Sequence, residues 1–304
     1  MKVAITGATG FIGRRIVPAL LARGDEVVAF TRDPTRANLP GVRLVQAELE
    51  HAGEWGAELA GCDAVINLAG EPIAGKRWDA RQKQRLRDSR IETTRNLVEA
   101  IAKLDAKPTA LISASGVDYY PFAQTSVGDF DDDEVTEADP PGEDFLSRLC
   151  AAWEAEAREA EKLGVRVATM RTGLVLGDGG ALAKMETPFK LFAGGRIGDG
   201  QQWMAWIHIV DVVDAYVCAC SDHRYLGPIN LVTQSVRNAD FAKMLGAVLH
   251  RPSWIPVPKF ALRLAVGEFA EALLNGRRVV PKRLQELGFT WRHPELNEAL
   301  RSTR

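Results

Sequence analysis

The sequence predicts an α/β fold in which a doubly wound parallel sheet is followed by a smaller C-terminal lobe. Two observations lead to this prediction. Short apolar segments alternate with longer helical patterns through the first 170 residues, and a glycine-rich turn joins the first apolar segment to the first helical one. Strands that alternate with helices of about ten or more residues form βαβ units with right-handed crossovers.

The individual elements follow from local patterns. Each predicted strand of the first half is a short apolar run, at residues 2–6, 26–30, 42–45, 64–68, 110–113 and 165–170. Helices are predicted where apolar residues recur every three or four positions, at residues 11–23, 79–103 and 145–163. Gly24 ends the first of these helices, as glycine often does after the last helical turn.

After about Arg171 the pattern changes, because glycines cluster and strands no longer alternate regularly with helices. We therefore divide the chain into a cofactor-binding domain, residues 1–170, and a mainly substrate-binding lobe, residues 171–304, which can return elements to the first domain. A proline-spaced stretch at 252–258 separates a predicted helix at 238–249 from another at 260–274. The acidic run at 129–139 is predicted to be a solvated loop, and a lid over a substrate is the alternative.

The composition excludes several classes of function. The chain has 38 Lys and Arg against 40 Asp and Glu, so its formal charge of -2 provides no overall attraction to nucleic acid or to an anionic membrane. No run reaches the roughly 18 apolar residues of a membrane span, and no leader pattern precedes the first strand. The histidines are scattered and the cysteines form no CxxC pair, so we expect no metal site and a reducing, cytoplasmic environment.

The first turn contains a dinucleotide-binding pattern, Gly7-Ala8-Thr9-Gly10-Phe11-Ile12-Gly13, between a predicted strand and a predicted helix. Gly7 permits the tight turn, Gly10 lets the backbone approach a pyrophosphate, and Gly13 permits close packing of the helix on the strand. The N-terminus of the helix offers free N–H groups to the anion. This context predicts a Rossmann-type domain that binds a dinucleotide, rather than a glycine-rich turn without a ligand.

The GxxGxxG spacing, within the segment TGATGFIG, resembles the extended branch of the short-chain dehydrogenase/reductase superfamily, which contains nucleotide-sugar epimerases and dehydratases. Asn67-Leu68-Ala69-Gly70 is similar to the NxAG segment of that branch, where the backbone passes beside the cofactor. Besides the three glycines, the resemblance implies cofactor contacts from Thr9, Phe11, Ile12, Leu68, Ala69, Gly70 and Ser113.

The end of the second strand distinguishes NADP(H) from NAD(H), and it reads Phe30-Thr31-Arg32-Asp33. An NAD site usually places an acid here for the ribose 2′-hydroxyl, whereas a guanidinium suits a 2′-phosphate. We therefore predict that Thr31 and Arg32 bind the cofactor and that NADP(H) is preferred over NAD(H). Asp33 is counter-evidence, and a solvated Arg32 is the alternative.

The catalytic residues that the resemblance implies are only partly present. In the superfamily a tyrosine acts as acid and base, a lysine four residues later lowers its pKa, and an upstream serine orients the substrate. No YxxxK occurs in this sequence. Leu146 takes the tyrosine's place and Cys150 the lysine's, and we expect both to pack in the core. Ser115 matches the serine, and either of the following tyrosines, Tyr119 or Tyr120, is a candidate proton donor, with packing as the alternative role.

Over almost its whole length the chain resembles an epimerase-like family that is variously described as nucleoside-diphosphate-sugar epimerases or cell-division inhibitors. The resemblance rests on the basic stretch at 77–95, the tyrosine pair after Ser115, and the segments 171–177, 179–182, 201–203, 206–208, 281–284 and 288–289. It implies NADP(H) binding but supplies no substrate. Asp118 and Pro121 depart from the family pattern, in which small residues or glycine are usual.

A substrate pocket is predicted at the carboxyl edge of the sheet, where open α/β sheets bind ligands. We expect it to be lined by Trp78, Trp203 and Trp206, with sealing of the interface between the lobes as the alternative for each. Gln202 is expected to hydrogen-bond the ligand, and the alternative for this residue is that it faces water. His208 is expected to be a structural histidine and Asp211 the N-cap of the following helix. The basic residues at 76–90 are expected to form a solvated helix face, and contact with a phosphate-bearing substrate is the alternative.

Two functions of different classes remain. The first is an NADP(H)-dependent oxidoreductase or epimerase-like enzyme that acts on a small polar, sugar-like substrate, as a monomer or a homo-oligomer. The second is a non-catalytic NADP(H)-binding protein that senses the cofactor and acts through a partner. A sugar-nucleotide epimerase of the usual mechanism is disfavoured, because that mechanism needs the tyrosine–lysine pair.

Overall fold

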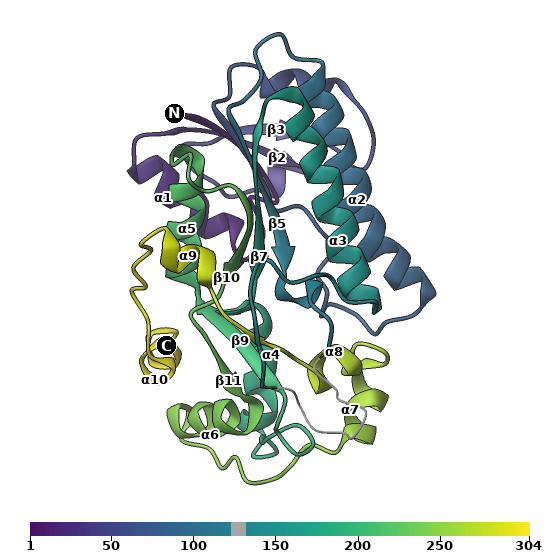
Figure 1. The fold of residues 1–304 in the computed structure, drawn as a ribbon, viewed down its shortest axis with the longest axis vertical. Helices are drawn as coiled ribbons and strands as arrows, with labels where there is room; N and C mark the ends of the chain where they lie inside the picture. The colour runs from purple at the N-terminus through teal and green to yellow at the C-terminus, as the bar shows by residue number, and fades with distance from the viewer. Residues whose placement is uncertain (123–131) are drawn as a thin grey trace.

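The computed structural model describes residues 1–122 and 132–304, and this part of the chain is built around a seven-stranded parallel sheet (Figure 1). The strand order is β10-β7-β5-β4-β1-β2-β3. The strands are β1 (Lys2–Thr6), β2 (Glu26–Thr31), β3 (Arg43–Gln46), β4 (Ala64–Asn67), β5 (Ala110–Gly116), β7 (Arg166–Thr172) and β10 (Gly227–Leu231). Every neighbouring pair is parallel, so the predicted parallel sheet is confirmed.

Both faces of the sheet are covered by helices, which explains the continuous apolar runs of its strands. Successive side chains of β1 point to opposite faces, so Val3 and Ile5 belong to one core cluster and Ala4 to the other. The first cluster includes α1 (Gly13–Ala22) and α5 (Ile209–Ser221). The second includes α2 (Ala80–Ala102) and α3 (Phe145–Arg158), which lie side by side in Figure 1.

The helices α2 and α3 begin at aspartate caps. The Asp79 carboxylate accepts the N–H of Gln82 at 2.7 Å, and the Asp144 carboxylate accepts the N–H groups of Leu146 and Ser147. Each cap satisfies backbone donors that have no partner within the helix. Both helices run antiparallel to the strands, so their first turns lie near the carboxyl edge of the sheet.

The chain after Arg171 contributes to two parts of the molecule. Strand β10 pairs with β7 in the central sheet, and α5 packs against α1. The remainder forms a smaller layer around a three-stranded sheet in the order β11-β9-β8. Its elements are β8 (Leu174–Leu176), α4 (Gly180–Lys190), β9 (Trp203–His208), β11 (Gln234–Arg237), α6 (Asn238–Leu249) and α10 (Leu296–Ser302). Short elements complete the chain: β6 (Glu134–Val135), β12 (Arg278–Val279) and α9 (Lys282–Glu286).

Two helix predictions are wrong in detail. The region 260–274 is not one helix, because α7 (Lys259–Val266) ends at Gly267, which has a φ of +65°, and α8 (Ala270–Leu274) follows. A Cβ on Gly267 would lie 3.0 Å from the Arg77 side chain, so this turn packs closely on the loop before α2. The region 145–163 is α-helical to Arg158 and continues as the 3-10 helix η4 (Glu159–Leu163).

The start of α5 also differs from the prediction, because its cap is His208 and not Asp211. The Nδ1 atom of His208 accepts the N–H two residues later, and its Nε2 atom lies 3.1 Å from Ser302 Oγ. The structural role expected of His208 is thereby confirmed. Asp211 is fully buried and accepts the N–H groups of Arg292 and His293, at 2.7 and 3.3 Å. It therefore ties the C-terminal segment to α5.

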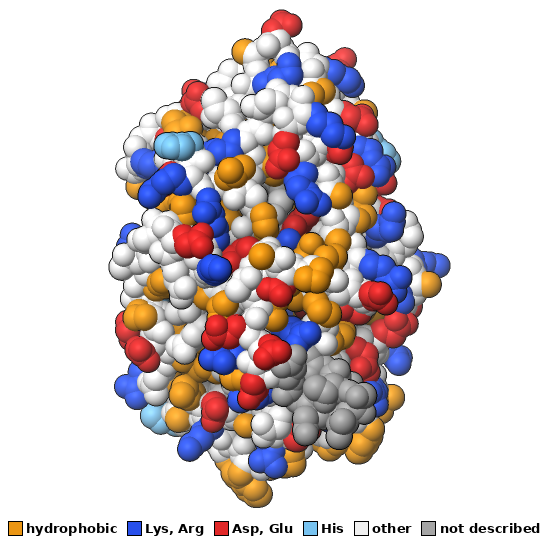
Figure 2. All heavy atoms as spheres, viewed as in Figure 1, with side chains coloured by type: hydrophobic (Ala, Val, Ile, Leu, Met, Phe, Trp, Pro, Cys, Tyr) orange, Lys and Arg blue, Asp and Glu red, His pale blue; other side chains and the backbone are white. Residues whose placement is uncertain are grey.

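The surface in Figure 2 mixes acidic and basic side chains, without a large area of either sign. In residues 1–122 and 132–304, no helix is both long and apolar enough to cross a membrane. The acidic run at 129–139 lies partly outside the described residues. Its described part is not a solvated loop throughout, because β6 pairs with β12 and Val135 is buried.

Candidate functional site

The glycine-rich turn after β1 is tightly packed on two sides and open on the third. Gly7 has a φ of +68°, and a Cβ there would lie 2.7 Å from the backbone of Leu68. A Cβ on Gly13 would lie 2.3 Å from the Gly7 carbonyl oxygen, so only glycine lets α1 approach β1 this closely. Gly10 is exposed, and a Cβ there would meet only the Gly7 carbonyl oxygen, at 3.1 Å. The turn therefore presents bare backbone at Gly10.

Free donors lie beside this bare backbone. The N–H groups of Phe11 and Ile12 have no hydrogen-bond partner within the described residues, and α1 has no side-chain cap. Thr9 is exposed next to them. Unpaired N–H groups at a helix N-terminus bind anionic groups such as a pyrophosphate. The turn therefore fits the phosphates of a dinucleotide.

The Phe11 ring joins this turn to the second half of the chain. Cβ atoms on Gly177, Gly179 and Gly180 would lie 2.9, 3.2 and 3.0 Å from the ring, so the ring packs directly on their backbone. Arg15 on α1 and Asp178 form an ion pair across the same contact. The glycine cluster after Arg171 thus lies against the dinucleotide turn.

The end of β2 presents a free cation. Arg32 is exposed, and within the described residues its guanidinium makes no hydrogen bond or ion pair. Asp33 is engaged: its carboxylate accepts the N–H of Thr35 at 3.0 Å and pairs with Arg36 at 3.2 Å. The Thr31 hydroxyl accepts the N–H of Asp33 at 3.4 Å. This position is where the adenosine ribose of a dinucleotide binds in such folds.

A buried polar network supports the segment after β4. The Thr6 hydroxyl donates to Asn67 Oδ1 at 2.8 Å and accepts the N–H groups of Leu68 and Ala69, at 3.1 and 3.2 Å. The Nδ2 atom of Asn67 lies 3.4 Å from Ser113 Oγ at the end of β5. Ser113 has no exposed surface, so it contributes by positioning this segment through Asn67.

Ser115 belongs to a buried charged cluster, the Ser115 cluster, which consists of Ser115, Glu154 and Arg171. The Ser115 hydroxyl donates to Glu154 Oε1 at 2.7 Å, and both carboxylate oxygens of Glu154 accept from Arg171, at 2.8 and 2.9 Å. All three residues are more than nine-tenths buried. Burial lowers the pKa of Arg171, but the hydrogen bonds and charge of Glu154 outweigh it and raise this pKa above its ordinary value. The cluster ties α3 to the carboxyl ends of β5 and β7.

The two tyrosines after Ser115 pack on the same arginine. The Tyr120 hydroxyl is buried, donating to Asn230 Oδ1 at 2.7 Å and accepting from Arg171 at 2.9 Å. Burial raises the pKa of Tyr120 to about 12. Tyr119 is half-buried, and its ring centroid lies 3.4 Å from the Arg171 guanidinium carbon. Of the pair, Tyr119 is the one that solvent reaches.

The prediction that Leu146 and Cys150 pack in the core is confirmed, since both are buried. Leu146 belongs to an apolar cluster with Trp78 and Leu86. Cys150 lies beside the end of β5, where its Sγ atom would be 3.7 Å from a Cβ on Gly116. Burial raises the pKa of Cys150 to about 12, so α3 places a neutral thiol at the position that the sequence predicts to align with the superfamily's lysine.

The four residues predicted to line a substrate pocket have different environments. Trp206 is fully buried, and the Trp78 indole is buried with its N–H donating to a backbone carbonyl at 2.9 Å. Gln202 is buried and donates to two backbone carbonyls. Trp203 is partly exposed, with the Arg237 guanidinium 3.9 Å from its ring centroid. Trp78 and Trp206 therefore have the packing role that was the alternative for the tryptophans, whereas Gln202 does not face water, which was the alternative for that residue.

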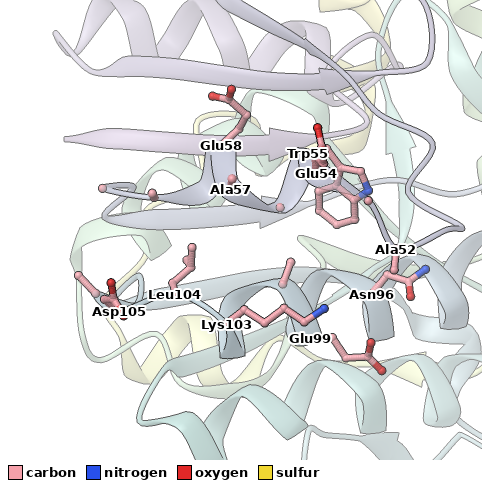
Figure 3. A pocket seen from close by; sticks show the side chains of 16 residues that line it. Ala52, Glu54, Trp55, Ala57, Glu58, Asn96, Glu99, Lys103, Leu104 and Asp105 are labelled. Atoms are coloured by element: carbon pink, nitrogen blue, oxygen red, sulfur yellow. The ribbon is translucent and has the colours of Figure 1, made fainter.

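A cavity of about 870 Å³ lies away from these residues, between the 3-10 helix η2 (Glu54–Leu59) and the C-terminal half of α2 (Figure 3). Trp55 borders it on one side, and Asn96 and Lys103 on the other. No predicted site residue lines it. The described ranges also contain no group of three or more His, Cys, Asp or Glu side chains placed to hold a metal ion.

Comparison with known proteins agrees with a dinucleotide site. A family model described as "NAD dependent epimerase/dehydratase family" matches residues 3–230, and a domain of unknown function, DUF1731, matches residues 257–303. The chain belongs to the NAD dependent epimerase/dehydratase family. This confirms the resemblance to epimerase-like proteins of the extended short-chain dehydrogenase/reductase type.

Relatives in this epimerase/dehydratase family match the chain over nearly its whole length. It is 42% identical to the chloroplastic epimerase family protein SDR39U1 homolog of Arabidopsis thaliana, over 99% of this chain and 86% of the relative. It is 36% identical to the epimerase family protein YfhF of Bacillus subtilis, over 99% of this chain and 97% of the relative. The fold is also similar to the crystal structure of human epimerase family protein SDR39U1 with NADPH, with a TM-score of 0.87 and 36% identity. The alignment covers 100% of this chain and 99% of the human chain.

For this epimerase/dehydratase family member, sequence reasoning missed charged residues that the fold buries, or half-buries in the case of Asp118, at the site. Arg90 was expected on a solvated helix face, and this is wrong because only 7% of its surface is exposed. Glu154 was treated only as part of a helical segment, and Asp118 only as a departure from the family pattern. Burial raises the pKa of Asp118 to about 6, and the nearby Asp144 carboxylate adds to this rise. Arg90 follows Leu86 by four residues, so it shares the apolar face of α2. A charged residue on an apolar face is the signal that would have found it.

Proposed function

We propose that the chain is an NADP(H)-dependent oxidoreductase or epimerase-like enzyme that acts on a small polar substrate. The observation that carries this proposal is the pair at the end of β2, where Arg32 is free and the Asp33 carboxylate is engaged by Thr35 and Arg36. A guanidinium binds a 2′-phosphate through charge-assisted hydrogen bonds, whereas a preference for NAD needs a free carboxylate. The NADPH in the structure of the human relative supports the same preference.

The residues present fit such a cofactor. The turn at 7–13 would hold the pyrophosphate, Arg32 the 2′-phosphate, and the backbone at 68–70 would lie beside the nicotinamide half. A bound nicotinamide supplies or accepts a hydride. The chain's own contribution to the chemistry is a proton donor, and Tyr119 is our candidate, because the Tyr120 hydroxyl is buried between Asn230 and Arg171.

A second candidate function is a non-catalytic NADP(H)-binding sensor. It is favoured by the buried Leu146 and Cys150 at the positions of the superfamily's tyrosine and lysine, and by the Ser115 hydroxyl that donates to Glu154. Both candidates require NADP(H) binding, and they differ in turnover. Oxidation of NADPH in the presence of carbonyl compounds supports the enzyme, while binding without any turnover supports the sensor.

Calorimetric titration with NADPH and NADH tests the proposed cofactor. We expect the wild type to prefer NADPH, and Arg32→Ala to weaken NADPH binding about tenfold or more without changing NADH binding, because one charge-assisted contact is lost. Arg158→Ala is the matched control, since Arg158 is another exposed arginine without a partner in the described residues, at the far end of α3. Equal affinity of the wild type for both cofactors, or an unchanged Arg32→Ala, would contradict the proposal.

A further inference from the structure

Arg90 on α2 is a buried cation with no counter-ion among the described residues. Only 7% of its surface is exposed. Within residues 1–122 and 132–304, its one hydrogen bond runs from Nη1 to the Leu86 carbonyl oxygen at 3.2 Å, and no carboxylate pairs with it. Its guanidinium carbon lies 5.1 Å from the Trp153 ring centroid. A guanidinium remains charged in a protein, so its burial without a counter-ion is unfavourable.

None of the described acidic side chains around Arg90 forms an ion pair with it. Glu71 pairs with the Lys76 ammonium at 3.2 Å, and Glu154 belongs to the Ser115 cluster. Asp118 is half-buried and forms no ion pair with Arg90, and burial raises the pKa of this carboxyl even with the guanidinium nearby. The Arg90 guanidinium therefore lies beside the carboxyl ends of β4 and β5 without a carboxylate at ion-pair distance in the described part of the chain.

The guanidinium is also accessible. A Cβ on the exposed Gly70 would lie 3.1 Å from the Arg90 guanidinium carbon and 3.3 Å from Nη1, so the missing side chain leaves this group uncovered. Each side-chain nitrogen of Arg90 either has a hydrogen-bond partner or keeps some contact with solvent. Its free N–H groups therefore reach solvent next to the segment that we expect to hold the cofactor.

We propose that Arg90 binds a carboxylate of the substrate, so that the substrate class is a carbonyl or hydroxyl compound that carries a carboxylate. The planar guanidinium matches a carboxylate through two parallel hydrogen bonds, and the carboxylate is the counter-ion that the described residues do not provide. The position is consistent with this role, since Arg90 lies against Gly70 after β4 and against Trp153 on α3, the helix that carries Cys150, which we align with the superfamily's lysine. This inference rests on the proposed function for the reaction, but carboxylate binding can be measured without turnover.

The test is calorimetric titration of the NADP⁺-saturated protein, at constant ionic strength, with probe pairs that differ by a carboxylate. The pairs are pyruvate with hydroxyacetone, and gluconate with sorbitol. We expect a carboxylate to bind about tenfold or more tightly than its neutral partner, as a charge-assisted contact predicts. Arg90→Met should remove this preference, and Arg90→Lys should keep part of it. Arg95→Met is the matched control, because Arg95 lies on the same helix in a surface ion pair with Glu156.

Carboxylate affinity that is the same in Arg90→Met and the wild type would overturn the inference, and so would the absence of carboxylate binding by the wild type. If Arg90→Met does not fold, as judged by circular dichroism, Arg90→Gln replaces it, because its amide can still donate to the Leu86 carbonyl. NADPH affinity is measured on every variant. A wild type that fails to bind NADPH contradicts the proposed function, whereas Arg90→Met that binds NADPH but no carboxylate supports both proposals.

Discussion

At the scale of single residues, the ion pair between Glu154 and Arg171 is the most buried charge interaction at the site, with side chains 3% and 4% exposed. Removing one partner leaves the other charged and buried, which costs about 3–5 kcal/mol. We therefore expect Glu154→Gln to lower the free energy of unfolding by about that amount in urea denaturation. Glu156→Gln is the matched control on the same helix, because its ion pair with Arg95 is more exposed and is worth less than about 1 kcal/mol. Equal losses in the two variants would contradict this account.

His208 gives the stability a pH dependence. Burial, together with the adjacent His293, lowers the pKa of His208 to about 4, from an ordinary value of about 6.5. Between these values the unfolded chain binds a proton that the folded chain excludes, so the contribution is complete above pH 6.5 and is lost as the pH falls toward 4. His208→Asn keeps a capping oxygen but does not titrate.

The measurement is the difference in unfolding free energy between the wild type and His208→Asn, which should increase from about pH 4 to pH 6.5. The exposed His51 provides the control, and the difference for His51→Asn should not follow this trend. A difference for His208→Asn that is constant over this range would show that the histidine is not held neutral by the fold.

The sequence predicted the roles of single residues where the backbone geometry permits only one residue type. The roles expected of Gly7 and Gly13 match the close contacts of the turn, because both follow from the geometry of one strand–turn–helix unit. Arg90 and Glu154 could not be recognised in this way. Whether a charged residue on a helix is solvated or buried depends on which neighbouring helix covers it, and α2 and α3 meet only in the folded chain.

At the scale of elements, two glycines of the turn between β1 and α1 have different predicted roles. We expect Gly13 to be needed for the stability of the fold, and Gly10 for cofactor binding. Gly13→Ala would force a Cβ to within 2.3 Å of the Gly7 carbonyl oxygen, so α1 must move away from β1. We expect lower stability in urea and weaker NADPH binding. Gly10→Ala is the contrasting variant, because its Cβ would lie on the open side of the turn. It should weaken NADPH binding while changing stability by less than about 1 kcal/mol. Similar losses of stability in both variants would contradict the arrangement.

Predictions of elements were accurate where the local sequence alone determines the bounds of the strand or helix. The strand β1 and the helix α6 have the predicted bounds, while β5 extends three residues beyond its prediction, to Gly116. The helix predicted at 260–274 failed because Gly267 turns the chain at a contact with the distant Arg77. The cap of α5 was assigned to Asp211 because the sequence does not reveal that the segment near Arg292 occupies its carboxylate.

At the scale of the whole molecule, the two halves of the chain share both the sheet and the site. The central sheet takes β10 from the second half, and the ring of Phe11 in the first turn packs on the glycines at 177–180. The predicted division at residue 170 allowed for returning elements but could not say which ones return. Strand order depends on long-range pairing, and nothing local in β10 specifies β7 as its neighbour.

Hydrogen–deuterium exchange with NADPH and NADH tests the central claim most directly, because it maps the cofactor on the whole chain. We predict that NADPH slows exchange at residues 7–13, 31–33 and 68–70, and that NADH slows it at the first and third segments but not at 31–33. Protection by NADPH confined to the cavity bordered by Trp55 and Lys103, or no protection of residues 7–13 by either cofactor, would contradict the account.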